Sequence, residues 1–234
     1  MKEKKLCIIV PAYNEAESIE KVINNIITNY SCYDYVIVND GSTDNTADIC
    51  RNKGYNIIDL PVNLGLTGAF QTGLKWALKQ EYEYVIQLDG DGQHDPRYIE
   101  GMLELADSEN LDIVIGSRFV GEKKPFSLRM FGSKIIDLII RIKSGKRLSD
   151  PTSGMRLFNR KVVKVMSHDI NMGPEPDTVA YLIKCGAKVK EYKVEMSDRE
   201  TGESYLNLSN SIKYMWKMCF SILIFQNFRE RKKI

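Results

Sequence analysis

The chain has 234 residues, 43% of them hydrophobic and 27% charged, an ordinary mixture for a globular protein that buries a core without disulfides. A formal net charge of only +2 argues against a protein that binds nucleic acid by overall electrostatic attraction. Five scattered cysteines without a C-x-x-C pair favour a reduced, cytoplasmic protein. No apolar run reaches the roughly 18 residues that a membrane span needs, so we expect any membrane contact to be peripheral.

The first 120 residues alternate between short apolar runs and amphipathic segments. Apolar runs predict strands over residues 6–10, 33–40, 55–61, 82–89 and 111–117. Periodic segments predict helices over residues 17–30, 46–54, 66–79 and 96–107. This alternation predicts an α/β fold with a mostly parallel central sheet flanked by helices.

Polar side chains follow four of the predicted strands at the point where each strand ends. They are Asn14 and Glu15, Asn39 and Asp40, Asp89 and Asp91, and Ser117 and Arg118. In open parallel sheets, ligands bind beyond the carboxyl ends of the strands. We therefore expect these side chains to face one crevice.

The second half of the chain is less regular. Residues 126–142 place Phe131, Ile135, Leu138, Ile139 and Ile142 on one helical face, widened by Ile136 and Ile140. This pattern predicts core burial, with a membrane-facing helix as the alternative. Further helices are expected over residues 161–166 and 177–186, and a strand over residues 187–196.

A last amphipathic segment over residues 211–228 carries Trp216 and is followed by the basic sequence "RERKK". We read it as a helix docked on the protein or lying at a membrane interface. The basic clusters of the second half are typical of a solvated face, or alternatively of contact with phosphate groups or an anionic membrane. The expected organisation is a catalytic domain over residues 1–208 and an amphipathic, membrane-associated helix with a basic tail over residues 209–234.

Six motifs occur in an order that resembles family-2 glycosyltransferases of the GT-A fold. They are "IIVPAYNEAESI", "VIVNDGSTDNT", "NLGLTGAFQTGLKWA", "LDGDGQHDP", "GSRF" and "DPTSGMRLF". The match is most similar to the dolichyl-phosphate or polyprenyl-phosphate mannose or glucose synthase branch, and it covers roughly residues 5–205. The resemblance implies a nucleotide-diphosphate sugar donor, a divalent metal and inversion at the anomeric carbon.

The acids Asp89 and Asp91 carry the metal hypothesis. By themselves, clustered Asp and Gly residues are also typical of a polar turn. In an extended segment the D-x-D spacing puts both carboxylates on one side, where they suit Mg²⁺ or Mn²⁺. Gln93 resembles the third metal-site residue of the family, whereas His94 is as consistent with a hydrogen bond to the turn backbone.

The resemblance also implies the residues that hold the donor. Those expected to bind the nucleotide sugar are Pro11, Ala12, Tyr13, Glu15, Asp40, Asp89, Gly90, Arg199 and Ser204. Asp40 matches the acid that contacts the base, and Arg199 and Ser204 belong to a loop that closes on the diphosphate. Glu15 has an alternative role as a carboxylate at the start of a helix. The base, uracil or guanine, stays open.

Three arginines match positions that hold the acceptor phosphate or the donor diphosphate: Arg118, Arg129 and Arg156. Arginine suits bidentate phosphate recognition. A phosphate acceptor is already ionised and needs no general base, whereas a hydroxyl acceptor needs one. The resemblance implies Glu175, or alternatively Asp177, as that base. Asp91, Arg156 and Glu175 are therefore the expected catalytic residues. Tyr205, where the lipid-phosphate branch usually has lysine, departs from the family pattern.

The leading hypothesis is an inverting, metal-dependent transfer of a hexose from a UDP- or GDP-sugar to polyprenyl phosphate, at the inner face of the cell membrane. The same catalytic domain with a hydroxyl acceptor, building a polysaccharide or glycolipid, is the alternative. A non-catalytic membrane-associated subunit is a third hypothesis, which the intact D-x-D motif disfavours. A dinucleotide-dependent dehydrogenase is disfavoured because no G-x-G-x-x-G follows the first strand.

Overall fold

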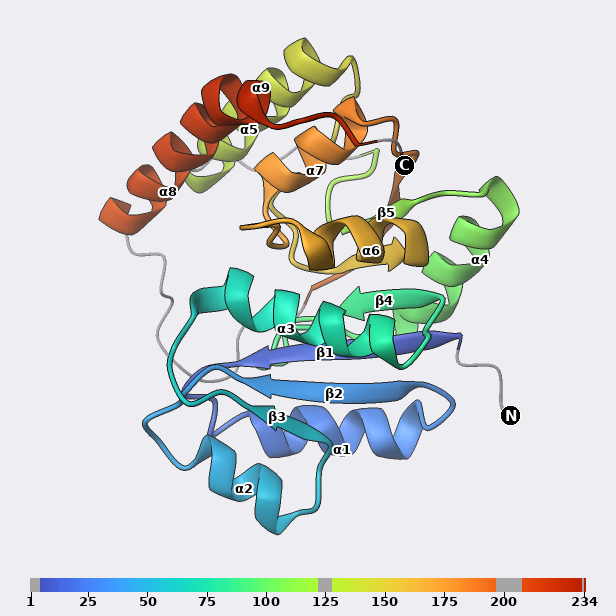
Figure 1. Cartoon of the computed structure of the whole chain (residues 1–234), viewed down its shortest axis with the longest axis vertical. Helices are drawn as coiled ribbons and strands as arrows, with labels where there is room; N and C mark the ends of the chain where they lie inside the picture. The colour runs from blue at the N-terminus through green and yellow to red at the C-terminus, as the bar shows by residue number, and fades with distance from the viewer. Residues whose placement is uncertain (1–4, 122–127, 197–207, 233) are drawn as a thin grey trace.

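The computed structural model describes residues 5–121, 128–196, 208–232 and 234, and contains one seven-stranded sheet (Figure 1). Its strand order is β3-β2-β1-β4-β6-β5-β7. The strands are β1 (Leu6–Ala12), β2 (Asp34–Asn39), β3 (Ile57–Asp59), β4 (Tyr84–Gln87), β5 (Ile113–Ser117), β6 (Arg156–Asn159) and β7 (Val189–Lys193). Only β6 runs antiparallel to its neighbours, so the sheet is mostly parallel, as predicted.

Helices connect the strands and cover the sheet. They are α1 (Ile19–Asn29), α2 (Thr46–Asn52), α3 (Gly65–Lys79), η1 (Pro96–Tyr98), α4 (Ile99–Glu109), α5 (Leu128–Ser144), α6 (Arg160–His168), α7 (Pro176–Lys184), α8 (Leu208–Phe220), η2 (Ser221–Phe225) and α9 (Gln226–Phe228). The segment η1 is a 3-10 turn, and η2 is a π-helical turn that continues α8.

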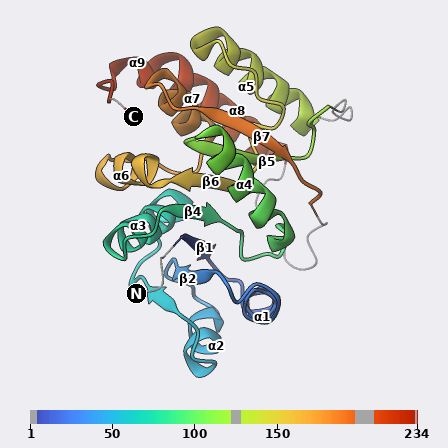
Figure 2. The same ribbon diagram turned by 90° about the vertical axis from the view of Figure 1, so that its right-hand side faces the viewer.

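Two buried apolar layers sandwich the sheet because successive strand residues point to opposite faces. Ile8, Ile37 and Ile86 pack on the side of α1 and α4, whereas Ile9, Val38 and Val85 pack on the side of α3 and α6. Figure 2 shows the sheet between these helices, with α5, α7 and α8 gathered at one end. The carboxyl ends of β1, β2, β4 and β5 point to the same edge of the sheet, as the sequence predicted.

The strand β6 was not predicted from the sequence. It has only four residues and follows the polar segment "DPTSG", so its apolar signal is short. Its position between β4 and β5 depends on long-range antiparallel pairing, which local periodicity does not report. β6 brings Arg156 opposite Gln87 of β4 and Ile115 of β5.

The predicted core face of α5 is partly wrong. Ile136 and Ile140 are the buried isoleucines among the described side chains of this helix, whereas Leu138 is 54% and Ile142 is 71% exposed. The helix is therefore rotated from the predicted stripe, because it packs against α7 on one side and α8 on the other.

The C-terminal segment is amphipathic in the structure. Met218 and Ile222 enter the core on the α3 and α6 side of the sheet, while Trp216 is 70% and Phe220 is 51% exposed. Among the helices in the described part of the chain, none combines the length and apolarity that crossing a bilayer requires.

Candidate functional site

The loops that follow β1 and β2 are joined by hydrogen bonds to short polar side chains. The Asn14 backbone N–H donates to Ser42 Oγ (2.9 Å), and the Thr43 backbone N–H donates to Asn14 Oδ1 (2.8 Å). The Glu15 backbone N–H donates to Thr46 Oγ1 (2.8 Å). Asn14 has a positive φ of 56°, a conformation that asparagine tolerates better than most residues. These contacts hold the expected nucleotide loop against the start of α2.

Asp40 has a structural role that the sequence did not indicate. Its side chain is only 3% exposed, and Oδ1 accepts a hydrogen bond from the Leu64 backbone N–H at 2.8 Å. The next residue, Gly41, has φ +64°, and an added Cβ would lie 2.7 Å from the Asn63 backbone nitrogen. Asp40 thus ties the end of β2 to the start of α3.

The D-x-D loop packs directly on the end of β1. An added Cβ on Gly90 would lie 3.3 Å from Pro11 O, 3.4 Å from Glu15 Cγ and 3.7 Å from Ala12 Cβ. Glu15 is oriented by Ser18, whose Oγ–H donates to Glu15 Oε2 at 2.6 Å. Five of the expected donor-site residues, at positions 11, 12, 15, 89 and 90, therefore lie together, and Tyr13 is 46% exposed beside them.

Asp89 is held from three sides. Gln87 Nε2 donates to Asp89 Oδ1 (2.8 Å), and the Asp89 backbone N–H donates to His94 Nδ1 (3.1 Å). An added Cβ on Gly154 would lie 2.9 Å from Asp89 Oδ2 and from His94 Cε1. His94 therefore orients the turn through the backbone, and the loop before β6 approaches the carboxylate so closely that glycine is needed there.

The other acids of this loop have different surroundings. Asp91 is 5% exposed, and its Oδ1 accepts from the Gln93 backbone N–H at 3.0 Å. Asp95 Oδ1 accepts from the Arg97 backbone N–H at 2.9 Å and caps η1. Asp95 is thus a helix cap, which separates it chemically from the D-x-D pair.

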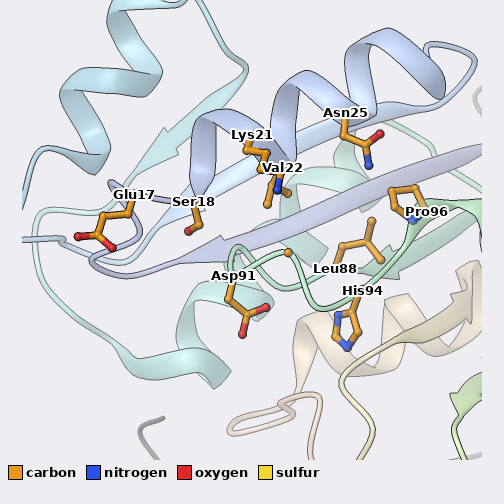
Figure 3. Close-up of a pocket in the computed structure, with 10 residues that line it drawn as sticks. Glu17, Ser18, Lys21, Val22, Asn25, Leu88, Asp91, His94 and Pro96 are labelled. Carbon is orange, nitrogen blue, oxygen red and sulfur yellow. The ribbon is translucent and has the colours of Figure 1, made fainter. Parts of the chain in front are cut away.

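A pocket adjoins Asp91 between α1 and the D-x-D loop. Figure 3 shows Lys21 and Asn25 from α1 on one side and Asp91 and His94 from the loop on the other. Leu88 and Pro96 supply its apolar lining. The pocket keeps one flank of the D-x-D loop open.

The residues present fit a divalent metal. Asp89 Oδ1 is occupied by the Gln87 amide, and this bond turns Asp89 Oδ2 toward Gly154 and His94. Among the described residues, no group of three or more His, Cys, Asp or Glu side chains could hold a metal. A metal at this site would therefore be held by two carboxylates and the amide oxygen of Gln93. Two carboxylates and the partly exposed Gln93 are hard oxygen donors that suit Mg²⁺ or Mn²⁺, whose remaining positions a diphosphate and water can fill.

Arg118 follows β5 and is held by a buried acid. Its Nε donates to Asp150 Oδ2 (2.7 Å) and its Nη2 donates to Asp150 Oδ1 (2.9 Å). Asp150 is fully buried, whereas the Arg118 side chain is 24% exposed. This bidentate pair orients the guanidinium and leaves part of it accessible at the edge of the sheet.

Arg156 is 1% exposed and lies in the sheet between β4 and β5. Its Nη2 donates to Pro151 O at 2.7 Å, while its Nε and Nη1 have no hydrogen-bond partner among the described residues. Gln87 Oε1 and Ser153 Oγ are also buried, and the described part of the chain offers them no hydrogen-bond partner. Burial lowers the pKa of Arg156, against the nearby negative charge that raises it. Arg156 lies opposite Gln87 in the β4–β6 register, and the amide of Gln87 donates to Asp89.

Glu175 precedes α7 and meets the C-terminal helix. Tyr214 Oη–H donates to Glu175 Oε2 at 2.5 Å. Desolvation raises the pKa of Glu175, while the Tyr214 hydrogen bond and the Arg156 charge lower it. Asp177, two residues later, accepts from Ser221 Oγ–H at 2.5 Å and from Gln226 Nε2 at 3.3 Å. Both acids therefore anchor the C-terminal segment.

Three expected site residues lie wholly or partly outside the part of the chain that the structure describes. Arg199 and Ser204 are outside the described residues, and so is the side chain of Arg129, whose backbone is in the first turn of α5. Conversely, sequence reasoning missed Gln87, Asp150 and Tyr214. "DPTSG" was a usable signal for Asp150, whereas the contact of Tyr214 with Glu175 depends on how α8 packs.

Comparison with known proteins gives a consistent result. The sequence profile described as "Glycosyl transferase family 2" matches residues 7–166. The undecaprenyl-phosphate mannosyltransferase of Micrococcus luteus is 28% identical over 216 residues, covering 87% of this chain and 88% of that protein. The UDP-N-acetylglucosamine–dolichyl-phosphate N-acetylglucosaminyltransferase of Methanococcus voltae is 30% identical over 191 residues, covering 73% and 75%.

A solved structure shows the same fold. Glucosyl-3-phosphoglycerate synthase from Mycobacterium tuberculosis, crystallised with Mn²⁺ and UDP-glucose, superposes with a TM-score of 0.70. The match covers 97% of this chain and 80% of that one, at 14% identity. The GT-A fold inferred from the sequence is confirmed.

Proposed function

The chain belongs to glycosyl transferase family 2, and we propose that it transfers a hexose from a nucleotide-diphosphate sugar to polyprenyl phosphate. The observation that carries this proposal is the meeting of two charged groups of residues at Gly154. An added Cβ on Gly154 would lie 2.9 Å from Asp89 Oδ2, and Gly154 belongs to the loop that carries Asp150, the partner of Arg118, and leads into Arg156 of β6. The acceptors named for the relatives, undecaprenyl phosphate and dolichyl phosphate, support the same chemistry.

The donor binds at the ends of β1 and β2 in this proposal. Tyr13 and Asp40 contact the nucleoside, and Asp89, Asp91 and Gln93 hold Mg²⁺ or Mn²⁺. The metal, when bound, neutralises the charge that develops on the leaving diphosphate. The structural relative crystallised with Mn²⁺ and UDP-glucose supports a divalent metal and a UDP-sugar donor.

The acceptor phosphate approaches from the side of Arg118, with Arg129 as a second contact. A phosphate oxygen forms a bond to the anomeric carbon while the bond from that carbon to the diphosphate breaks, so a nucleoside diphosphate leaves. A single displacement of this kind inverts the anomeric carbon. The attacking oxygen is already ionised at neutral pH, so the step needs no general base.

Contact with the inner face of the cell membrane is also part of the proposal. The exposed stripe of the C-terminal helices contains Lys213, Trp216, Lys217, Phe220, Leu223, Ile224 and Phe228. Aromatic side chains beside lysines are typical of a helix that lies in the headgroup region of an anionic bilayer. This face would hold the site near a lipid acceptor.

The test is donor turnover by the purified chain. It would be incubated with Mn²⁺ and, in turn, UDP-glucose, UDP-galactose, UDP-N-acetylglucosamine and GDP-mannose, with and without a short polyprenyl phosphate. We expect nucleoside diphosphate release from one donor to rise at least about tenfold with the lipid. Release that the lipid does not change would instead favour a hydroxyl acceptor with Glu175 as base.

A further inference from the structure

The loop before β6 is held by carboxylates of two other elements. Glu191 of β7 accepts two successive backbone N–H groups, that of Ser149 at Oε2 (2.7 Å) and that of Asp150 at Oε1 (2.7 Å). The preceding N–H, that of Leu148, donates to Asp137 Oδ1 of α5 at 2.9 Å. Hydrogen bonds from a backbone N–H to an ionised carboxylate are short and strong. The backbone of this segment is therefore fixed by side chains of a strand and a helix.

Glu191 lies beside the strand that leads to Arg118. β7 is the edge strand next to β5 (Figure 2), and Glu191 is paired with Ile115 in their parallel register. Arg118 directly follows the end of β5. The two residues thus reach Asp150 from neighbouring strands, since Glu191 binds its backbone and Arg118 binds its side chain.

Asp150 connects the Glu191 contact to the guanidinium of Arg118. Its Oδ2 accepts from Arg118 Nε at 2.7 Å and its Oδ1 accepts from Arg118 Nη2 at 2.9 Å, and the Asp150 side chain is fully buried. An aspartate side chain is short, so the position of its backbone determines where the carboxylate lies. Because Glu191 holds that backbone, a shift of the loop would turn the Arg118 guanidinium with it.

The same turn also contacts Arg156. Pro151, the residue after Asp150, accepts a hydrogen bond from Arg156 Nη2 at its backbone oxygen (2.7 Å). The Ser153 backbone N–H donates to the Asp150 backbone oxygen at 3.2 Å and closes the turn. Proline restricts its own φ and the backbone of the residue before it, which reduces the freedom of this segment further. One short segment therefore contacts the guanidinium groups of both Arg118 and Arg156.

We propose that Glu191 is a positioning residue for the acceptor phosphate, acting through Asp150 on Arg118. Its carboxylate holds the backbone of the loop, and the Asp150 carboxylate then presents the partly exposed guanidinium at the edge of the sheet. Each of these links is a direct hydrogen bond. This inference rests on the proposed function, in which Arg118 meets the acceptor phosphate.

The sign of the effect separates positioning from a purely electrostatic role. Glu191→Gln keeps the shape of the side chain but removes its negative charge, and its NH₂ group cannot accept one of the two backbone N–H bonds. If Glu191 acted only by its charge, this change would strengthen phosphate binding, because a negative charge repels phosphate. If Glu191 positions Arg118, the change weakens phosphate binding. Glu191→Asp, which keeps the charge but withdraws the carboxylate, should weaken it as well.

The experiment compares Glu191→Gln and Glu191→Asp with wild type in turnover of the preferred donor at increasing concentrations of a short polyprenyl phosphate. We expect the KM for the acceptor to rise by about tenfold, the size expected for one hydrogen bond to a charged group, while the KM for the donor changes less than about twofold. The matched control is Glu109→Gln, which removes the carboxylate that pairs with Lys190 of β7 and should change neither KM. An unchanged or lowered acceptor KM in both Glu191 variants would overturn the inference.

A second measurement does not depend on activity. Urea unfolding of Glu191→Gln, Arg118→Lys and the double variant forms a double-mutant cycle. Because both residues hold Asp150, we expect the double variant to lose less unfolding free energy than the sum of the single losses. Additive losses would overturn the inference. Wild-type protein that turns over no donor would count against the proposed function alone, since the cycle still decides whether Glu191 supports the Arg118–Asp150 pair.

Discussion

The two sides of the candidate site hold charges of opposite sign by different means. On the donor side, Asp40, Asp91 and Asp95 are oriented by backbone N–H groups of nearby loops. On the acceptor side, Arg118 is held by a buried carboxylate, and Arg156 is buried in the sheet with its Nη2 donating to Pro151 O. The difference teaches that backbone N–H groups orient the carboxylates of the donor side, whereas a buried side-chain carboxylate and burial in the sheet orient the guanidinium groups of the acceptor side.

This comparison also explains where each ligand fits. Oriented carboxylates favour a cation and the diphosphate that the cation carries. Oriented guanidinium groups favour a phosphate. Gly154 belongs to the loop before β6, on the acceptor side. It is the point of contact with the donor side, because an added Cβ there would lie 2.9 Å from Asp89 Oδ2 and from His94 Cε1.

The largest effect is expected on the donor side. Asp91→Ala should reduce metal-dependent turnover by at least about a hundredfold, because it removes one of the two carboxylates proposed to hold the cation. The measurement is initial rate against Mn²⁺ concentration, with the folded state checked by circular dichroism.

The matched control is Asp95→Ala in the same loop. This variant loses the cap of η1, which costs about 1 kcal/mol of stability, and should keep turnover within about twofold. Equal losses in the two variants would show that the D-x-D pair has no special role.

An intermediate effect is expected where the two sides meet. Gly154→Ala places a Cβ against Asp89 Oδ2 and should weaken Mn²⁺ binding by about 10- to 100-fold, measured by the electron paramagnetic resonance signal of free Mn²⁺. Ser153→Ala removes a buried hydroxyl without a partner in the described structure and should leave Mn²⁺ affinity unchanged. Unaltered Mn²⁺ affinity in Gly154→Ala would show that the loop before β6 does not affect the metal site.

The smallest effect is expected at the outer face of α8. Trp216→Ala should weaken binding to vesicles containing anionic lipid by roughly tenfold, because it removes the most exposed aromatic ring of α8. Co-sedimentation measures this change. The control is Trp76→Phe, since Trp76 stacks on Tyr82 away from that face. Vesicle binding that is equal in both variants would contradict the proposed membrane contact.

The sequence predicted the strands beneath the donor side well because their signals are local. The apolar runs located β1, β2, β4 and β5, and the parallel arrangement then brought their polar ends to one edge. The D-x-D spacing and the motif order supplied the chemistry.

The acceptor side was harder to predict because its contacts depend on tertiary packing. β6 is short and antiparallel, and α5 is rotated so that Leu138 faces outward. The contact between Tyr214 and Glu175 joins residues 39 positions apart, and no periodicity indicates it.

The most direct test of the account compares two acceptors that differ only in their head group. The purified chain, Mn²⁺ and the preferred donor would be incubated with equal concentrations of a short polyprenyl phosphate or the matching polyprenol, and the lipid products measured by mass spectrometry. The account predicts one added hexose on the polyprenyl phosphate and none on the alcohol, because the cations beside the acceptor recognise phosphate. Equal or preferential glycosylation of the alcohol would contradict it.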